Sequence, residues 1–338
     1  MTRDMAKEIS ISELAERLNI SVTTVSRALS GKGRVGEETR KRVLDYIEEH
    51  DYIPNIHRPK EIEKPTRTIC VTLPGEEDFA EMPYFQKIML SIYDYFQTRD
   101  YDIIVIKIKA DDIGALERVI LNRKVDGVIL TRAIEDSMAI QYLKKEKVPF
   151  VVIGSYHDSD VYQVDVEQEN ACRELTSILI RMGIRDIALF CADISHMVTQ
   201  SRYNGFVKAF EENNLSVDTS RVFDEVGYQL VAEKVIEDLL KQQIECIICM
   251  DDNICINVLN KLRKENVKIP EDIKVASFFN NSLLSSYYPP ITCLDFDIQE
   301  LGMVAAKMML DVLEGNDTPK RLELGYQVML KNSTKMSV

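Results

Sequence analysis

The stretch from residue 11 to residue 31 reads ISELAERLNISVTTVSRALSG, and it decides the fold of the N-terminal part. Its first half carries apolar residues at helical spacing, Asn19 interrupts that pattern, and Ser21 is a suitable N-cap for a second helix. Two helices joined by so short a turn predict a helix-turn-helix, although an ordinary small helical bundle has the same pattern. The small polar residues that begin the second helix suit a close approach to the major groove of DNA.

A third helix is predicted from Glu37 to His50, after a loop marked by Gly31 and Gly33. We therefore assign residues 1–56 to a three-helix DNA-binding domain and residues 57–66 to a hinge linker. The residues expected to form the small core of this domain are Leu14, Ala15, Leu18, Val25, Leu29, Val43, Leu44 and Ile47.

Short β-branched runs alternate with amphipathic helical patterns from Pro65 onward, which predicts an α/β fold of parallel sheets with crossover helices. About 270 residues of this pattern exceed one sheet, so residues 67–338 are predicted to form two lobes. A ligand is expected at the carboxyl ends of the strands, between the lobes. The predicted strands cover residues 68–73, 102–108, 126–130, 150–153, 186–190, 246–250, 274–278 and 291–296, and the helical patterns include 84–98 and 252–265.

The composition supports a large core, because 45% of the 338 residues are apolar. The net charge of −13 argues against a chain coated with basic side chains. Residues 1–67 hold 13 Lys and Arg against 12 Asp and Glu, so the acidity belongs to the remainder, whose net charge is −14. No apolar run is long enough to cross a bilayer and the first residues lack a secretory signal, so we expect a cytoplasmic protein with no membrane partner.

The seven cysteines are scattered and are expected to be reduced and buried. Cys246 and Cys249 form a C-x-x-C within an apolar strand, where their sulfur atoms would point to opposite faces, and no second pair completes a zinc site. The sequence also lacks a phosphate-binding loop, a G-x-S-x-G elbow, an H-E-x-x-H helix and a dinucleotide fingerprint. We therefore expect no catalytic residues, no metal and no cofactor, and the sequence does not indicate an enzyme.

Several motifs together resemble the LacI/GalR family of transcription regulators. The strongest is the stretch 11–31, continued by ETRKRV at 38–43 and YIPN at 52–55. The resemblance implies a homodimer whose helix-turn-helix binds double-stranded operator DNA. It also implies that a two-lobed, periplasmic-binding-protein-like domain, with three strand crossovers between its lobes, binds a small sugar. Weaker matches follow in the same order, namely VDGVI at 125–129, SRYNGF at 201–206, DD at 251–252, IPEDI at 269–273, PPIT at 289–292 and LG at 301–302.

The resemblance implies roles for residues of the N-terminal domain. Val22, Thr23 and Arg27 would face base edges, and their chemistry agrees, because an arginine can bridge a guanine and valine methyl groups can contact a thymine methyl. The side chains that would contact phosphates are Ser21, Thr24, Ser26, Thr39 and Asn55. For Thr24 and Ser26, simple solvation of the helix remains an open alternative.

In the large domain, Arg202 matches the sugar-binding arginine of the family, and its guanidinium offers a fork of donors to neighbouring hydroxyl groups. Asp251 and Asp252 follow an apolar strand and would lie at the edge of the site. Phe279 stands where the family usually carries an acid, although an alignment shifted by one residue would place Asn280 there. The FNNS at 279–282 resembles the maltose-regulator branch. Further candidates are Tyr84, Phe85 and Phe296, with core packing as the alternative for the two phenylalanines.

The function implied is that of a sugar-controlled regulator, and more specifically a repressor, of carbohydrate-utilisation genes. Within the family, control by a purine base or by a phosphoprotein corepressor is the alternative. Outside the family, the alternatives are a sugar-binding protein of an extracytoplasmic compartment and an enzyme. The missing secretory signal and the N-terminal domain argue against the first, and the absence of catalytic motifs argues against the second.

The linker departs most from the family pattern. The resemblance implies a hinge helix whose leucine wedges into the minor groove, but residues 56–65 read IHRPKEIEKP and Glu61 occupies the leucine position. A carboxylate there would face a strongly negative potential. Only about one helical turn fits between Pro59 and Pro65, and such a short helix is unstable on its own. Ile62 is the candidate for a shifted wedge.

We predict that this hinge inserts weakly or not at all, so that the operator is bent less than is usual for the family. Circular-permutation gel shifts measure the bend. A strong central kink that disappears in Ile62→Ala would show that the shifted wedge works, and it would contradict this prediction.

Overall fold

The chain forms two compact units, Met1–Lys64 and Pro65–Val338, in the computed structural model. The structure describes residues 7–30, 35–50, 52–55, 65–75, 83–194, 196–224 and 229–335. Most of the predicted linker 57–66, including Ile62, lies outside the described residues, so its bounds stay a prediction. Its last part belongs to the large unit, because the backbone N–H and the hydroxyl of Thr66 both donate to Asp126 Oδ1, at 2.7 and 2.8 Å.

The N-terminal unit has the three predicted helices, α1 (Ile11–Leu18), α2 (Val22–Ser30) and α3 (Glu37–Glu49). A parallel pair of strands, β1 (Lys7–Ser10) and β2 (Tyr52–Asn55), was not predicted. Ser21 caps α2 as expected, because the backbone N–H of Thr24 donates to its hydroxyl oxygen at 3.1 Å. The prediction that Leu44 points inward is wrong: it is 46% exposed, because residues four apart, such as 43 and 47, share the inner face of a helix and residue 44 does not.

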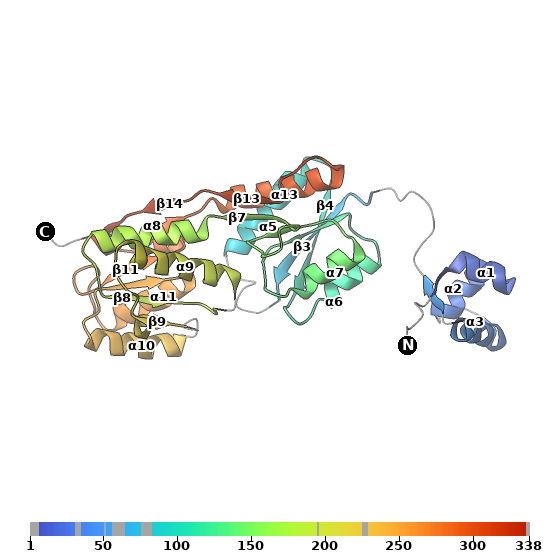
Figure 1. Ribbon diagram of the computed structural model, residues 1–338, viewed down its shortest axis with the longest axis horizontal. Coiled ribbons are helices and arrows are strands. Elements are labelled where there is room, and N and C mark those ends of the chain that lie inside the picture. Colours follow the sequence, from blue (N-terminus) through green and yellow to red (C-terminus); the bar gives the residue numbers. More distant parts are fainter. Residues whose placement is uncertain are drawn as a thin grey trace. The chain divides into compact units, whose positions relative to one another are not determined.

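The large unit contains two six-stranded sheets, each with its own set of helices (Figure 1). The first lobe has a fully parallel sheet in the order β13-β7-β6-β5-β3-β4. Its strands are β3 (Thr68–Pro74), β4 (Asp102–Ile108), β5 (Gly127–Leu130), β6 (Phe150–Ile153), β7 (Tyr162–Val166) and β13 (Arg321–Leu324). Its helices are α5 (Pro83–Gln97), α6 (Gly114–Leu121), α7 (Met138–Glu146) and α13 (Ile298–Glu314).

The second lobe has the order β14-β12-β11-β10-β8-β9, in which only β14 is antiparallel. Its strands are β8 (Ile187–Phe190), β9 (Val222–Phe223), β10 (Cys246–Cys249), β11 (Lys274–Ser277), β12 (Thr292–Asp295) and β14 (Gln327–Met329). Its helices are α8 (Gln168–Arg181), α9 (Met197–Glu212), α10 (Gln229–Lys241), α11 (Asp252–Lys264) and α12 (Ser282–Ser286), with short 3-10 turns at Thr219–Arg221 and Asn332–Thr334.

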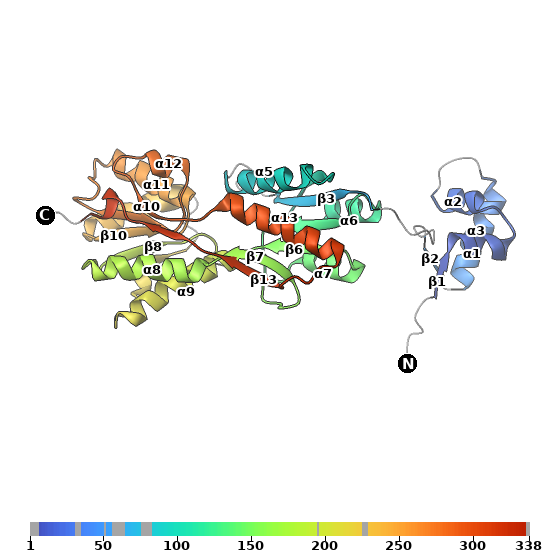
Figure 2. The same ribbon diagram turned by 90° about the horizontal axis from the view of Figure 1, so that it is seen from above.

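The chain passes three times between the lobes, as predicted. It crosses from β7 to α8, returns from β12 to α13, and crosses again from β13 to β14. Figure 2 shows the last crossing as a long ribbon between β13 of the first lobe and β14 of the second. The carboxyl ends of the parallel strands of both lobes are therefore the expected place for a ligand.

Buried side chains form three clusters in the large unit. One cluster spans both lobes and includes Ile69, Phe96 and Cys246, whereas Cys249 belongs to a second cluster on the other face of the second sheet. The prediction that these two sulfur atoms point to opposite faces is confirmed. All seven cysteines are free and buried, and burial raises the pKa of the Cys246 thiol to about 12.

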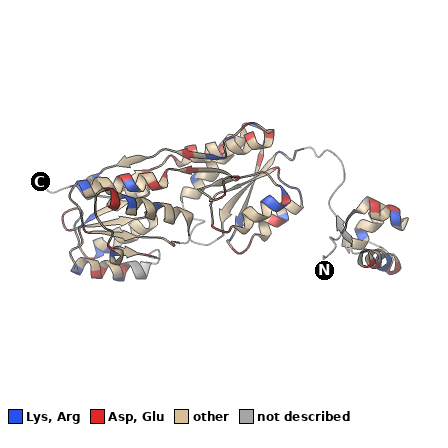
Figure 3. Cartoon of the chain, viewed as in Figure 1, with Lys and Arg blue, Asp and Glu red and all other residues tan. Residues whose placement is uncertain are grey.

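The large unit carries charged residues of both signs on its outer helices (Figure 3). Within the described residues, none of the helices combines the length and the apolar character that a membrane span requires.

Candidate functional site

The start of α2 presents the first candidate surface. Val22 is 48% exposed, and the side chains of Thr23 and Arg27 are exposed as well. Because α2 already buries Val25 and Ala28 in the small core, the exposed residues lie on the remaining face of the same helix. An exposed valine beside a hydroxyl and a guanidinium suits contacts with base edges.

Of the predicted phosphate contacts, Ser21 and Thr24 lie at the start of α2, Ser26 lies further along the same helix, and Thr39 belongs to α3. Ser21 and Thr24 share a hydrogen bond between their hydroxyl oxygens at 2.7 Å, while Ser26 and Thr39 are half-buried. Asn55 ends strand β2, whose side chains are outside the described ones, and Ile62 is outside the described residues altogether. The N-terminal unit thus offers hydroxyls and backbone N–H groups at the start of a helix, which suit phosphate oxygens.

The second candidate site is built around Arg202 on α9, which is only 8% exposed. Its Nε donates to Gln168 Oε1 at 3.0 Å, and its Nη1 donates to the backbone oxygen of Met250. A guanidinium has five N–H donors, so these two bonds fix its plane and leave further donors for a ligand. The buried charge is thereby partnered rather than isolated.

Aromatic rings from both lobes meet beside this arginine. The ring of Tyr84, at the start of α5, lies 5.8 Å from the ring of Phe279 in an edge-on arrangement. Phe279 stacks at 6.1 Å on Phe296, and the guanidinium carbon of Arg202 lies 5.7 Å from the centre of the Phe279 ring. Tyr84 also contacts Phe85 at 5.0 Å, and Phe85 is buried. The structure thus brings together Tyr84, Arg202, Phe279 and Phe296, as the sequence predicted for one site.

The predicted acids and amides follow the strands of the second lobe. Asp251 caps α11, because its Oδ1 accepts from the backbone N–H of Ile254 at 2.8 Å. Asp252 accepts a hydrogen bond of 2.8 Å from Asn281 Nδ2, and Asn280 Nδ2 donates to Asp295 at 2.8 Å. These groups are held in place by partners in their own lobe.

Charges of the site influence one another across the two lobes. Burial raises the pKa of the Asp251 carboxyl, and the positive charge of Arg202 opposes that rise. Burial also raises the pKa of the Tyr84 phenol, which is raised further by Asp165 and lowered by Arg202. Tyr84 and Asp165 of the first lobe therefore lie within electrostatic range of Arg202 of the second lobe.

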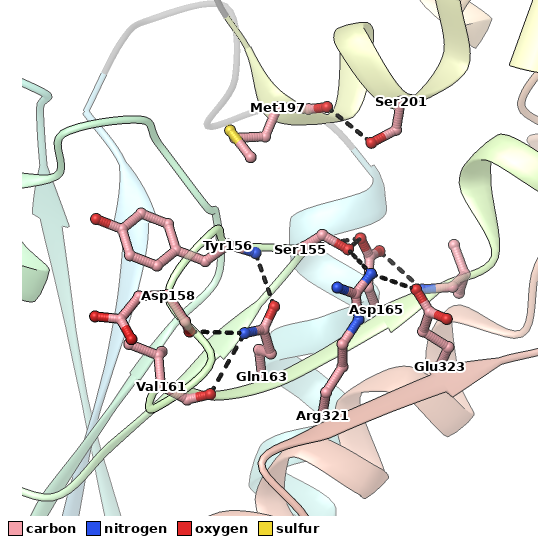
Figure 4. Close-up of polar contacts among 11 residues, drawn as sticks. Ser155, Tyr156, Asp158, Val161, Gln163, Asp165, Met197, Ser201, Arg321 and Glu323 are labelled. Atoms are coloured by element: carbon pink, nitrogen blue, oxygen red, sulfur yellow. Dashed lines mark hydrogen bonds and ion pairs between the residues drawn. The ribbon is translucent and has the colours of Figure 1, made fainter. Parts of the chain in front are cut away.

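Gln168, Ser155 and Asp165 are parts of this region that the sequence analysis missed. The only signal was the alternation in YQVDV at 162–166, which would ordinarily place Gln163 and Asp165 in solvent. Both are buried, because the loop after β6 covers their face of the strand. Figure 4 shows this loop opposite Met197 and Ser201, which belong to the helix that carries Arg202.

A small pocket opens in the first lobe but involves none of the predicted ligand residues. Its volume is about 50 Å³, enough for water rather than for a sugar. It is lined mainly by residues of the loops after β4 and β5, among them Lys109, Arg132 and Ser137.

Two family descriptions match the chain. Residues 10–55 match the lacI family of bacterial regulatory proteins, and residues 176–334 match a periplasmic binding protein-like domain. The HTH-type transcriptional regulator RegA of Clostridium saccharobutylicum is 29% identical, over 96% of this chain and 99% of that protein. The HTH-type transcriptional regulator MalR of Streptococcus pneumoniae is 26% identical, over 93% of this chain and 95% of that protein.

Solved structures share the fold. A probable maltose operon transcriptional repressor, malR, of Staphylococcus aureus covers 81% of this chain and is itself covered completely, with a TM-score of 0.75 and 24% identity. The complex of the transcriptional regulator CelR with cellobiose has a TM-score of 0.73 and 22% identity, and the match covers 96% of this chain and 99% of that chain. The lac repressor dimer bound to operator has a TM-score of 0.70 and 19% identity, and the match covers 97% of this chain and 99% of that chain.

A helix-turn-helix unit followed by a two-lobed unit of the periplasmic-binding-protein type defines a class of regulator in which one chain carries a DNA-binding and a ligand-binding part. The chain belongs to the LacI/GalR family, and it is an HTH-type transcriptional regulator rather than an enzyme.

Proposed function

We propose that this regulator is a homodimeric repressor of carbohydrate-utilisation genes, controlled by a small sugar bound between the lobes of its large unit. The observation that carries the sugar assignment is the buried guanidinium of Arg202 set against aromatic rings. A guanidinium fork suits neighbouring hydroxyl groups, and a ring face suits the C–H side of a sugar. The cellobiose bound to the structural relative CelR supports this choice over a purine base or a phosphoprotein.

The sugar assignment is tested with glucose, maltose and cellobiose against adenine and guanine. A ligand that binds the folded state raises the melting temperature, so one of the sugars should raise it and the purines should not. A shift produced by a purine alone would favour the alternative within the family. Calorimetry with the active sugar then gives its dissociation constant.

We predict that Arg202→Ala weakens binding of that sugar at least about 100-fold, because hydrogen bonds to a charged group contribute about 1.5–3 kcal/mol each. Gln168→Ala should weaken it about 10-fold by releasing the guanidinium, whereas Gln168→Glu keeps an acceptor and retains affinity. Operator affinity measured without sugar should stay within about 2-fold for all three variants, since each changes a residue of the large unit and leaves the N-terminal unit unaltered.

The matched control for this prediction is Gln141→Ala, which removes an exposed glutamine of α7. Its sugar affinity should equal that of the wild type. An unchanged dissociation constant in Arg202→Ala would show that the sugar binds elsewhere.

For DNA, we propose that Val22, Thr23 and Arg27 contact base edges and that Ser21, Thr24, Ser26, Thr39 and Asn55 contact phosphates. Arg27→Ala should lose about 1–3 kcal/mol per half-site for operator and leave binding to random DNA nearly unchanged. Fluorescence anisotropy at one fixed salt concentration measures both affinities. If the variant discriminates operator from random DNA as well as the wild type does, Arg27 does not contact base edges.

The homodimer is proposed from apolar residues that the large unit leaves exposed along one side. Leu90 and Tyr93 on α5 are 56% and 48% exposed, and Leu283 on α12 is 62% exposed. Figure 2 places α5 and α12 on the same long side of the large unit. Apolar side chains from both lobes along one side are typical of an interface that buries both lobes of each subunit.

We predict that Leu283→Asp combined with Leu90→Asp converts the dimer to a monomer, because charged groups would be buried without partners. Sedimentation velocity measures the change. Leu121→Asp on α6, where the leucine is 52% exposed, is the control and should remain dimeric. A monomeric wild type, or a variant that stays dimeric, would contradict this surface assignment.

A further inference from the structure

The loop that joins β6 to β7, residues 154–161, is held by two buried polar side chains of β7. Gln163 and Asp165 lie two residues apart and therefore on the same face of the strand. Gln163 Oε1 accepts from the backbone N–H of Tyr156 at 2.8 Å, and its Nε2 donates to the backbone oxygens of Asp158 and Val161 at 3.2 and 3.4 Å. Every one of these partners is backbone, so Gln163 sets the path of the loop.

Asp165 acts on a side chain as well as on backbone. Its Oδ2 accepts from both the backbone N–H and the hydroxyl of Ser155, each at 2.8 Å, and its Oδ1 accepts from the N–H of Val166 at 2.8 Å. The Ser155 proton is thereby committed to the carboxylate. A second neighbour, Arg321 on β13, donates to the same hydroxyl oxygen at 3.2 Å, as Figure 4 shows.

These bonds determine what Ser155 can offer to a ligand. A hydroxyl has one proton and two lone pairs. The proton goes to Asp165 and one lone pair accepts from Arg321, so the other lone pair can accept from a further donor. Ser155 is half-buried rather than enclosed, and it stands at the carboxyl end of β6, the edge at which ligands of parallel sheets bind.

The loop also faces the helix that carries Arg202. Met197 and Ser201 of the first turns of α9 lie opposite Ser155 in Figure 4. Burial raises the pKa of the Asp165 carboxyl, and the positive charge of Arg202 opposes that rise, so the two groups are within electrostatic range. Ser155 and Arg202 thus belong to one region with walls from both lobes.

We propose that Ser155 is an effector contact that accepts a hydrogen bond from a sugar hydroxyl, and that Asp165 is a positioning residue that fixes Ser155 as an acceptor. This inference rests on the proposed function, because it specifies how the first lobe recognises the sugar. It assigns complementary roles to the two walls: Arg202 donates to sugar oxygens, and Ser155 accepts from a sugar hydroxyl. A sugar that lacks that hydroxyl would leave Ser155 without its donor.

The first arm of the test is calorimetry with the active sugar among glucose, maltose and cellobiose, and with the monodeoxy analogues of that sugar. Ser155→Ala should weaken binding of the active sugar about 10-fold. One monodeoxy analogue should bind Ser155→Ala and the wild type equally, which a general loss of stability would not produce. The control is Ser159→Ala, which removes an exposed hydroxyl of the same loop and should leave binding unchanged. Wild-type affinity in Ser155→Ala would overturn the contact.

The second arm is hydrogen exchange, which needs no sugar. Asp165→Asn should raise the exchange rate of the Ser155 and Tyr156 amides about 10-fold or more while the amides of β10 and β11 keep their wild-type rates. Unchanged exchange in the loop would overturn the positioning role. If glucose, maltose and cellobiose all fail to bind the wild type, the sugar assignment fails and the Ser155 contact fails with it, whereas the exchange rates still decide what Asp165 does.

Discussion

The proposed ligand site of this regulator depends on how one guanidinium is held inside the protein. Arg202 is buried on α9, and a buried charge is costly unless it is partnered. Gln168 and the backbone oxygen of Met250 provide the partners, and the ring of Phe279 covers the guanidinium on one side. Gln168 is the first residue of α8, directly after the first crossing between the lobes, so the arginine is anchored close to the place where the two lobes join.

The two lobes contribute unequal chemistry around this arginine. The second lobe supplies Arg202, Phe279 and Phe296 together with acids and amides that are bonded within the lobe. The first lobe supplies Tyr84 and the loop held by Gln163 and Asp165. Any movement of the lobes about the three crossings would change the distance between these two sets, which is how a ligand between them can bias the conformation of the whole unit.

Much of the fold could be predicted from the sequence, because the patterns were strong and local. The cap at Ser21 and the strand at 102–108 were predicted correctly. The apolar run from Ile103 to Ile106 was expected to be buried on both faces, but Val105 is 43% exposed because β4 is an edge strand of its sheet. Strand β7 was missed, although its polar residues alternate with valines as in a half-buried strand. Burial of Gln163 and Asp165 depends on a loop that folds back over them, and no local pattern encodes that covering.

Only part of the candidate site was predicted, because only some of its residues lie in a local sequence pattern. Arg202 lies in a recognisable motif, whereas its partner Gln168 lies 34 residues away and is brought to it by the packing of α8 against α9. Partnerships of this kind arise from tertiary structure. The predicted inward position of Leu44 failed for a simpler reason, since an apolar residue in a short helix was assigned to the core without regard to the face it occupies.

The proposed function requires that sugar binding between the lobes and operator binding by the N-terminal unit are energetically coupled. Calorimetric titration of the active sugar into the protein, with and without saturating operator DNA, measures this coupling. The dissociation constant of the sugar should change by the same factor by which the sugar changes operator affinity, because coupling between two sites is reciprocal. A sugar dissociation constant that is identical with and without operator would contradict the account.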